Sequence, residues 1–321
     1  MDKFLERYSS AIEQAFGEYY RRHTSPEHLY QPVHYILSLG GKRLRPALVL
    51  LAADSFGCPL EKAMPAAMAI EVFHNFSLVH DDIMDHAPLR RGHPTVHCRW
   101  DANTAILSGD VMMIQAYELF ESYQGDTFRE VILAFNRVAR QVCEGQQLDM
   151  DYEKIGDVSQ AQYMEMIRLK TAVLIGGALR IGGIVAGASI RELEALEGFG
   201  TDVGLAFQLT DDYLDTFGDP RTFGKRIGGD ILEGKKTFLY ITARERASRE
   251  EFERAFSLAE EEEKIEAVRD LYRTTGADQA LREQIDRYTE KALAHVDRLP
   301  FSQPYREHYI RLARALVQRK L

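Results

Sequence analysis

Two short aspartate-rich motifs are the residues whose types and spacing most clearly predict chemistry in this sequence. They read DDIMD at 81–85 and DDYLD at 211–215. On a helix, positions i and i+4 share a face, so the first and last aspartates of each motif would lie side by side. Like charges at this spacing repel each other, and a divalent cation would offset the repulsion. Because Mg²⁺ binds carboxylate oxygens and is often completed by substrate phosphates, the motifs facing each other across a helical bundle predict a polyphosphate site.

A helix end with exposed aspartates is the simplest alternative for either motif alone. Each motif, however, follows an apolar helical run, EVFHNFSLVH before the first and GLAFQLT before the second. Acidic residues at a helix C-terminus oppose the helix dipole and therefore cost stability. Two such costly arrangements in one chain indicate a functional role.

Basic residues near these motifs narrow the chemistry to phosphate binding. They stand in the segments GGKRLRP, LRRG, RLKTA and FGKRIGGDILEGKKTF, and comprise Lys42, Arg43, Arg45, Arg90, Arg91, Lys170, Lys225, Lys235 and Lys236. Guanidinium forks and lysine ammonium groups suit phosphate oxygens. Any one of these residues alone is more often surface charge. Together with two metal motifs, they predict two anionic sites, one bridged by metal and the other held by Lys and Arg directly.

The elements that must position these residues are helices. Apolar residues recur at three- and four-residue spacing, whereas strand-like alternation is almost absent. The predicted helices cover 2–22, 27–39, 46–56, 60–85, 102–122, 128–150, 160–186, 190–217, 235–246, 260–273, 278–297 and 303–319. No linker or short-period repeat separates them. We therefore expect an all-α, single-domain protein over residues 1–321, a bundle of ten or more helices around a central cavity, with the charged segment 250–290 at the surface.

The composition excludes several classes of protein. The net charge of −9 argues against a nucleic-acid or anionic-membrane partner. The three cysteines, Cys58, Cys98 and Cys143, are far apart and form no CxxC, so a disulfide framework or zinc site is not expected and a cytoplasmic location is. The N-terminus lacks a signal-peptide apolar region. The apolar stretch 172–188 is short for a membrane span and contains Arg180, so we expect a buried helix and no membrane span.

The quoted motifs resemble those of the trans-isoprenyl diphosphate synthases of the polyprenyl synthetase family, from about residue 36 to residue 240. The resemblance includes GGKRLRP, EVFHNFSLVHDDIMD, LRRGHPTVH, SGD at 108–110, GQQLDMD at 145–151, KT at 170–171, FQLTDDYLD and the GK…GGD…EGKKT segment. The one departure is KKTFLY, where the family usually has Leu-Pro after the threonine. The resemblance implies the isoprenoid synthase type I fold and a homodimer.

It also implies a Mg²⁺-dependent head-to-tail condensation of isopentenyl diphosphate with an allylic diphosphate, which releases pyrophosphate. Three Mg²⁺ per active site would be bound by Asp81, Asp82, Asp85, Asp211, Asp212 and Asp215. The allylic diphosphate would be contacted by Arg90, Lys170, Thr171, Gln208, Lys225 and Lys235, of which Lys170, Thr171 and Gln208 would act in catalysis. Isopentenyl diphosphate would be held by Lys42, Arg45, His74 and Arg91.

The length of the product is expected to depend on the residues before the first motif. Phe76 lies five positions before Asp81, about 7–8 Å up a helix axis at ~1.5 Å per residue. Ser77 lies four positions before Asp81, and Phe73 lies eight before it. An aromatic residue at the fifth position with a small residue at the fourth resembles geranylgeranyl diphosphate synthases of archaeal type. Aromatic residues at both positions resemble farnesyl diphosphate synthases, so twenty carbons are favoured and fifteen remain the alternative.

Other functions stay open on the residues alone. A class I terpene cyclase also carries DDxxD, but its second metal motif differs from DDYLD and it needs no GGKRLRP pocket. EVFH at 71–74 is one half of a di-iron signature without its second half, and HD at 80–81 would suit a phosphohydrolase but leaves the second motif unexplained. A longer-chain synthase is a further alternative. A regulatory subunit of a heteromeric synthase typically lacks aspartates that this chain retains.

Overall fold

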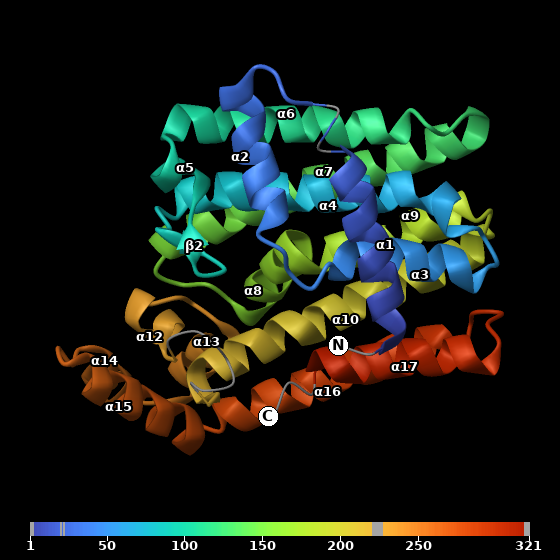
Figure 1. Ribbon diagram of the computed structural model, residues 1–321. Coiled ribbons are helices and arrows are strands. Elements are labelled where there is room, and N and C mark those ends of the chain that lie inside the picture. Colours follow the sequence, from blue (N-terminus) through green and yellow to red (C-terminus); the bar gives the residue numbers. More distant parts are fainter. Residues whose placement is uncertain (1–2, 20, 22, 220–226, 318–321) are drawn as a thin grey trace. The chain divides into compact units, whose positions relative to one another are not determined.

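The computed structural model describes residues 3–19, 21, 23–219 and 227–317, and they are almost entirely helical (Figure 1). The chain divides into two compact units, Met1–Ala139 with Gly177–Glu197, and Arg140–Gly176 with Gly198–Leu321. Each unit is described by itself. The all-α class with ten or more helices is confirmed, whereas the single domain stays a prediction.

The elements up to the middle of the chain belong mainly to the first unit. They are α1 (Lys3–Tyr19), α2 (Glu27–Ser38), α3 (Leu44–Ser55), α4 (Leu60–Met84), β1 (Leu89–Arg90), β2 (His93–Pro94), α5 (Val96–Arg99), α6 (Ala102–Phe120) and α7 (Gly125–Lys154). Strands β1 and β2 form an antiparallel hairpin in which Arg90 pairs with His93. This hairpin directly follows the first aspartate motif and carries the two arginines of LRRG.

The remaining elements belong mainly to the second unit. They are α8 (Gln160–Ile167), the π-helix η1 (Arg168–Ala172), α9 (Val173–Val185), α10 (Ile190–Phe217), α12 (Gly229–Glu233), α13 (Phe238–Arg246), α14 (Arg249–Phe256), α15 (Glu261–Thr274), α16 (Ala277–Val296) and α17 (Gln303–Val317). Helices α7, α9 and α10 each contribute residues to both units.

The core of the first unit surrounds α4, which packs against α3 and α6. Helix α4 is rich in alanine and apolar on most of its faces, as expected for a helix that is buried nearly all round. Aromatic rings fill the space beside it. The ring of Phe135 lies 5.2 Å from that of Phe73 and 5.1 Å from that of Phe120, with all three side chains fully buried. This packing holds the helix end that carries the first motif.

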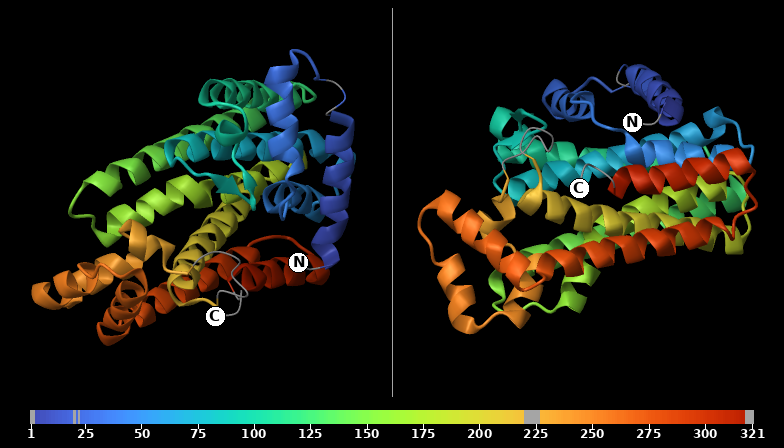
Figure 2. Two further views of the ribbon diagram at one scale, coloured as in Figure 1. Left: turned by 60° about the vertical axis from the view of Figure 1, so that its left-hand side comes forward. Right: turned by 90° about the horizontal axis from the view of Figure 1, so that it is seen from below.

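In the second unit, α16 and α17 lie side by side (Figures 1 and 2). Their packing includes Tyr309 of α17, whose ring lies 5.1 Å from that of Phe199 in α10. Helix α10 also approaches α9 closely, because a Cβ at Gly200 would lie 2.7 Å from the Cα of Gly176. The second motif occupies the end of α10, so these contacts position its aspartates.

The apolar segment 172–188 is mostly helix α9, and its residues from Ala172 to Val185 are buried except for the half-buried Arg180. Arg180 within it forms an ion pair with Glu197 at 3.0 Å, which offsets the cost of a charge in an apolar helix. The prediction of a buried helix is confirmed. Within the part of the chain that the structure describes, no helix has both the length and the hydropathy needed to cross a bilayer.

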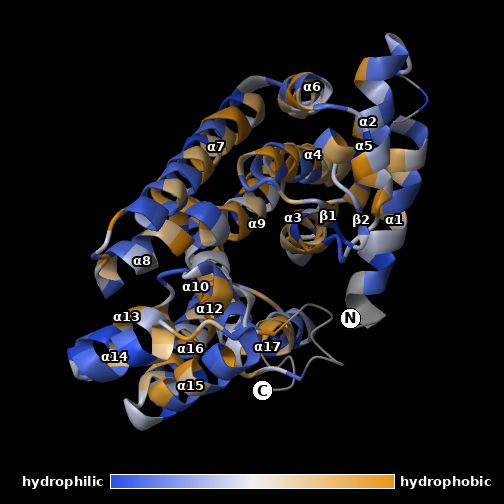
Figure 3. Ribbon diagram, turned by 90° about the vertical axis from the view of Figure 1, so that its left-hand side faces the viewer, coloured by the Kyte–Doolittle hydropathy of each residue, from blue (hydrophilic) through white to orange (hydrophobic). Residues whose placement is uncertain are grey.

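Most predicted helices are present, but two features differ from the prediction. The region predicted as one helix over 160–186 contains the π-helical turn η1. The short helices α5, α12 and α14 were not predicted. Helix α14 is short and mostly polar, as its hydrophilic colouring in Figure 3 shows, and only Phe252, Ala255 and Phe256 pack against the core.

Candidate active site

The first aspartate motif lies at the C-terminal end of α4, where Asp85 is the C-cap residue. Asp82 is 1% exposed and accepts hydrogen bonds from Arg90, whose Nε lies 2.8 and 2.9 Å from the two carboxylate oxygens. The Nη2 of Arg90 also lies 2.7 Å from Asp82 and 3.7 Å from Asp81. Burial raises the pKa of Asp82, and the guanidinium of Arg90 works in the opposite direction. Asp82 therefore anchors the arginine that the sequence assigned to the allylic diphosphate.

The backbone around the predicted phosphate contacts is strained. Among the described residues other than glycine, the positive φ angles belong to Arg43 at 43°, His86 at 50° and Arg91 at 54°. Each such residue costs on the order of 1–3 kcal/mol and persists only where the surroundings impose it. All three lie in GGKRLRP or in the turn and hairpin after the first motif. Strain of this kind concentrates at functional sites.

Arg45, His74 and Arg91 come together in the first unit and are named here the arginine–histidine cluster. The Nη1 of Arg45 lies 3.1 Å from Nε2 of His74. Arg91 donates to the carbonyl of Gly40, and a Cβ at Gly41 would lie 3.0 Å from the Cζ of Arg91. Glycine in this loop therefore lets the guanidinium of Arg91 reach the backbone. Lys42 is exposed in the same loop.

The electrostatics of this cluster favour an anion. Burial lowers the pKa of His74 well below its usual value, and Arg45, Arg91, Arg90 and Arg43 lower it further, in that order. Because arginine only donates, Nε2 of His74 must accept, and the neutral ring carries its proton on Nδ1. The Nε of Arg45 is buried and has no hydrogen-bond partner within the described residues. A buried, incompletely paired guanidinium is stabilised by an anionic ligand.

Among the described residues, Asp212 of the second motif accepts hydrogen bonds from neutral side chains, whereas Asp82 of the first motif accepts them from an arginine. Asp212 is buried; its Oδ2 accepts from the Tyr163 hydroxyl and its Oδ1 accepts from Nε2 of Gln208 at 3.1 Å. The oxygen of Gln208 in turn accepts from the Thr171 hydroxyl at 3.1 Å. Burial, and then the nearby carboxylate of Asp230, raise the pKa of Asp212 to about 8. The structure thus brings together Thr171, Gln208 and Asp212, all of which the sequence assigned to the site.

Lys170 and Thr171 lie in the π-helix η1. The Nζ of Lys170 lies 2.5 Å from Oδ2 of Asp149 on α7. Helix α7 approaches this turn so closely that a Cβ at Gly145 would lie 2.2 Å from the backbone nitrogen of Lys170. Single π-helical turns are frequent at functional sites, where the extra residue changes the direction of neighbouring side chains.

The loop after the second motif folds back onto it. The backbone nitrogen of Asp230 donates to Oδ1 of Asp215 at 3.0 Å. Lys235 lies 3.5 Å from Oδ1 of Asp230 and 2.9 Å from Oε2 of Glu233. Lys225, which the sequence also assigned to the allylic diphosphate, lies outside the described residues.

Several residues near the site received no role from the sequence. Asp149 and Asp230 stand in quoted motifs, yet their positions beside Lys170 and Lys235 depend on tertiary contacts. Tyr163 lies outside every quoted motif and had no signal at all. Arg43 was recognised only as one cation of a basic loop, and its partner Glu71 only as part of a possible metal signature.

The residues assigned to product length form one aromatic row on α4. The ring of Phe76 lies 4.8 Å from that of His80 and 5.6 Å from that of Phe73. Ser77 donates to the carbonyl of His74 at 2.8 Å, so its small side chain folds back on the helix. Phe73 is fully buried and Phe76 only partly. Their role in product length stays a prediction.

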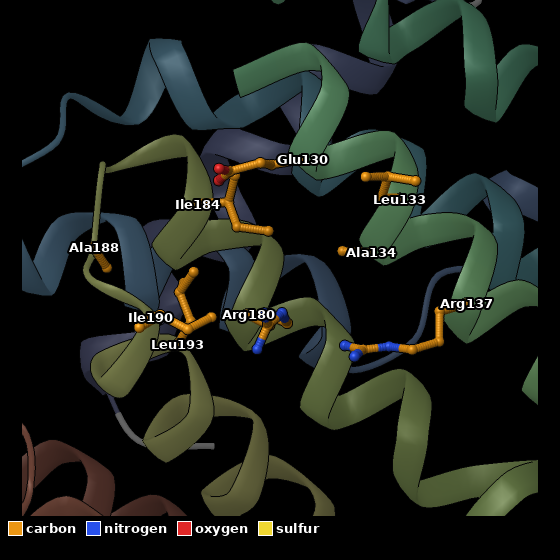
Figure 4. A pocket seen from close by; sticks show the side chains of 9 residues that line it. All are labelled: Glu130, Leu133, Ala134, Arg137, Arg180, Ile184, Ala188, Ile190 and Leu193. Atoms are coloured by element: carbon orange, nitrogen blue, oxygen red, sulfur yellow. The ribbon is translucent and has the colours of Figure 1, made fainter. Parts of the chain in front are cut away.

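A separate pocket of about 310 Å³ in the first unit is lined by none of the predicted site residues (Figure 4). The guanidinium groups of Arg137 and Arg180 point toward each other there and share Glu197, at 2.6 and 3.0 Å. The remaining lining is mostly apolar. Since one carboxylate already pairs with both arginines and Glu130 also borders the pocket, its charges are largely balanced.

The carboxylates of the two motifs decide whether the chain could bind a divalent cation. Across the described ranges, no group of three or more His, Cys, Asp or Glu side chains is arranged to hold a metal ion. Mg²⁺ keeps several waters and usually takes one or two carboxylates together with substrate phosphates. Each motif supplies an i, i+4 aspartate pair of this kind at the end of a helix. The residues therefore fit a metal that binds together with a phosphorylated substrate.

Comparison with known proteins gives a consistent result. A short chain isoprenyl diphosphate synthase from Methanothermobacter thermautotrophicus is 42% identical over 79% of this chain and 78% of its own length. A crystal structure of a geranylgeranyl pyrophosphate synthase has a TM-score of 0.92 and 46% identity over 98% of this chain and 99% of its own.

A geranylgeranyl pyrophosphate synthase from Corynebacterium glutamicum, complexed with isoprenyl diphosphate and magnesium, has a TM-score of 0.82 and 28% identity over 98% of this chain and 96% of its own. The sequence model of the family described as Polyprenyl synthetase matches residues 26–275 of this chain. This chain belongs to the polyprenyl synthetase family.

Proposed function

We propose that this prenyltransferase condenses isopentenyl diphosphate with allylic diphosphates to give geranylgeranyl diphosphate and pyrophosphate. Membership of the polyprenyl synthetase family supports the reaction class. The observation that carries the proposal is the cluster of Arg45, His74 and Arg91, in which a buried guanidinium nitrogen has no partner among the described residues. Such a cluster suits a diphosphate that is bound without metal. It distinguishes a two-substrate synthase from a terpene cyclase, which needs no second diphosphate pocket.

Asp81 and Asp85 of the first motif, and Asp211 of the second, would bind Mg²⁺ together with the allylic diphosphate. When bound, Mg²⁺ neutralises the negative charge that develops on the leaving diphosphate. Asp82, Asp212 and Asp215 would support the ligands. The magnesium-containing relative is consistent with this choice of metal. The number of ions, three per site, belongs to the proposal.

Fixed cations of the chain would share the work of binding the allylic diphosphate. Lys170 and Lys235 are held by Asp149 and by Asp230 with Glu233, so their ammonium groups are positioned before substrate arrives. Arg90 is likewise fixed by Asp82. Preorganised donors of this kind stabilise developing charge without reorganisation during the reaction. Lys225 is proposed for the same role on sequence resemblance alone.

Breaking the allylic C–O bond leaves a carbocation that must be kept from water. The Thr171 hydroxyl donates to the Gln208 oxygen, which fixes the orientation of both side chains. Their oxygens would lie near the reacting carbons and stabilise the cation. Lys42, Arg45, His74 and Arg91 would hold isopentenyl diphosphate so that its double bond attacks the cation. A proton is then lost from the adduct, and the departing pyrophosphate would accept it.

Product length would depend on Phe76 with Ser77 at its side and Phe73 behind it. The rings of Phe76 and Phe73 are in contact, so removing one bulky side chain would open space toward the next. We expect Phe76→Ala to shift the products from twenty carbons to longer chains. Product chromatography after incubation with isopentenyl diphosphate checks this, and an unchanged distribution would reject Phe76 as the limit.

The family resemblance also leads us to propose a homodimer in the cytoplasm. Helix α6 exposes Leu107 by 59% and Ile114 by 57%, and α7 exposes Leu133 by 58%. Exposed apolar side chains on neighbouring turns are typical of a surface that another subunit covers. Light scattering should give twice the chain mass, and Leu107→Glu with Ile114→Glu should shift it to a monomer.

The direct test of the function is to incubate the purified chain with Mg²⁺, isopentenyl diphosphate and each allylic primer. Twenty-carbon product is expected from dimethylallyl, geranyl and farnesyl diphosphates. A product that stops at fifteen carbons would replace geranylgeranyl by farnesyl diphosphate as the product. Conversion of an allylic diphosphate without isopentenyl diphosphate would favour a cyclase, and no turnover by the single chain would favour a regulatory subunit.

A further inference from the structure

Arg43 differs from the other cations of GGKRLRP because its side chain points into the protein. Its guanidinium is 1% exposed and therefore shielded from solvent. We propose that Arg43 is a positioning residue for the isopentenyl diphosphate pocket, and that through it the first helix of the chain helps to shape this pocket. The inference rests on the proposed function, since it names what sets the geometry of the second diphosphate site.

The guanidinium of Arg43 connects three helices. Its Nε donates to Oε1 of Glu13 on α1 at 2.6 Å, and its Nη1 donates to Oε1 of Glu71 on α4 at 2.8 Å. Its Nη2 donates to the carbonyl of Leu37 on α2. The charge also lies 5.3 Å from the ring centroid of Phe16 on α1. Each of the three guanidinium nitrogens therefore has a partner within the protein, and the group is shielded from the solvent through which a diphosphate would arrive.

The partners of Arg43 are themselves well fixed. Glu71 is 3% exposed, and it also accepts from Nδ2 of Asn75 at 3.2 Å. A buried carboxylate requires a cation or several donors, and Arg43 supplies the cation. The two carboxylates, Glu13 and Glu71, raise the pKa of Arg43 although burial opposes its charge. These contacts strongly determine the position of Arg43.

The backbone of Arg43 transmits this position to the pocket. Its φ of 43° and ψ of 35° place it in the left-handed region as the N-cap of α3, and its carbonyl accepts from the Ala47 nitrogen at 3.1 Å. Arg45 stands in the first turn of the helix that starts there, where it contacts His74. Lys42 precedes the capping residue directly. A change in how Arg43 is held would therefore displace both substrate-facing cations of the loop.

The same loop holds Arg91 from the other side. Arg91 donates to the Gly40 carbonyl, three residues before Arg43. The loop thus lies between the buried anchor of Arg43 and the guanidinium of Arg91. Because both contacts involve this one segment, loosening the anchor should weaken binding of isopentenyl diphosphate and leave binding of the allylic substrate nearly unchanged.

Three variants separate the side chain from the backbone. Arg43→Lys keeps a positive charge but cannot make the three-way fork. Arg43→Gly accepts the left-handed backbone without strain but has no side chain. Glu13→Gln leaves Arg43 and Glu71 in place and weakens only the contact with α1. Arg7→Met is the matched control, because Arg7 also fixes α1 by contacting Asp54 of α3, but away from GGKRLRP.

Steady-state kinetics with farnesyl diphosphate as the primer should separate the two substrates. We expect KM for isopentenyl diphosphate to rise roughly tenfold in Arg43→Lys and Arg43→Gly and about threefold in Glu13→Gln, since small misplacements of binding groups have effects of this size or larger. KM for farnesyl diphosphate should stay within about twofold in all three. Arg7→Met should leave both constants near their wild-type values.

The outcomes distinguish this inference from the proposed function. If wild-type protein does not condense the two substrates, the proposed function fails. If it does, and Arg43→Gly keeps a wild-type KM for isopentenyl diphosphate, Arg43 is not a positioning residue. Equal increases in both KM values, or a loss of folded protein with unchanged KM, would also overturn the inference. Should the Arg43 variants not fold, an unchanged KM in Glu13→Gln would overturn the role of α1.

Discussion

Asp82 and Asp212 hold the same place in two motifs with nearly the same letters, but they face opposite surroundings. Asp82 receives a bidentate guanidinium from Arg90. Asp212 receives the neutral donors of Tyr163 and Gln208, with the carboxylate of Asp230 nearby. Among the described contacts, Asp82 thus pairs with a cation, whereas Asp212 pairs with neutral donors beside a further acid. Identical spacing of aspartates therefore does not determine the local charge.

The aspartates within each motif also differ from one another in burial. The middle residues, Asp82 and Asp212, are buried and hold neighbouring side chains in place. The first and last residues of each motif are less buried than these two: Asp81, Asp211 and Asp215 are half-buried, and Asp85 is exposed. The middle aspartates are therefore best regarded as residues that organise the site, and the outer ones as the candidates for direct metal binding.

The largest expected effect tests whether both motifs bind metal despite this difference. Asp81→Ala and Asp211→Ala should each lower kcat by roughly a thousandfold or more, about 4 kcal/mol in the barrier, because the leaving diphosphate loses charge neutralisation. Circular dichroism should show that both variants fold. Asp126→Ala, which removes an exposed carboxylate at the start of α7, is the control. Full activity in either motif variant would show that only the other motif binds an essential metal.

The second prediction concerns stability without metal. Asp82→Asn leaves Arg90 facing a neutral group, and we expect a loss of about 3 kcal/mol in the free energy of unfolding. In Asp212→Asn the amide oxygen can still accept from Gln208 and the amide nitrogen can donate to the Tyr163 hydroxyl, so the change should stay below about 1 kcal/mol. Denaturant unfolding in EDTA measures both. Equal losses would mean that the two surroundings are energetically alike.

The sequence predicted the helices that carry both motifs, because α4 and α10 have long apolar periodicity that ends at the aspartates. It did not predict the π-helical turn at Lys170, beside which α7 lies so close that a Cβ at Gly145 would meet the backbone of Lys170. Helix α14 is short and mostly polar, although its capping box, Ser248 with Glu251, was readable in the sequence.

The sequence predicted which residues form the candidate site, but not the direction in which each side chain points. Lys42 and Arg43 are adjacent cations, yet only the left-handed backbone at Arg43 decides which of them points inward. The second neutral donor of Asp212, Tyr163, was also missed, because it is 49 residues away and belongs to another helix. Which cation is structural and which faces substrate is fixed by packing that no local pattern records.

The third prediction concerns His74 of the first unit, whose pKa is lowered by burial and by four nearby arginines, and its effect on stability at low pH. His74 stays neutral in the folded protein well below its usual pKa, whereas in the unfolded chain it binds a proton below about 6.5. The unfolded state then holds the extra proton, so stability must fall as the pH falls below about 6.5. At pH 5 the residue should account for about 2 kcal/mol of lost stability.

His74→Gln should remove this component, so the difference between wild type and variant should shrink or reverse between pH 7 and pH 5. Denaturant unfolding at several pH values measures it. A difference that does not depend on pH would show that His74 binds protons equally in the folded and unfolded states, and that the four arginines do not control its charge.

The smallest expected effect concerns the neutral donors of the second unit. Tyr163→Phe removes the hydroxyl that donates to Asp212 but leaves the amide of Gln208 in place. A neutral hydrogen bond contributes about 1 kcal/mol, so the metal-free protein should lose about that much on unfolding in denaturant, well below the loss from Asp82→Asn. A loss as large as that of Asp82→Asn would mean that Tyr163 supports its aspartate as strongly as the guanidinium of Arg90 does. The contrast between the two motifs would then lie in charge alone and not in the strength of their support.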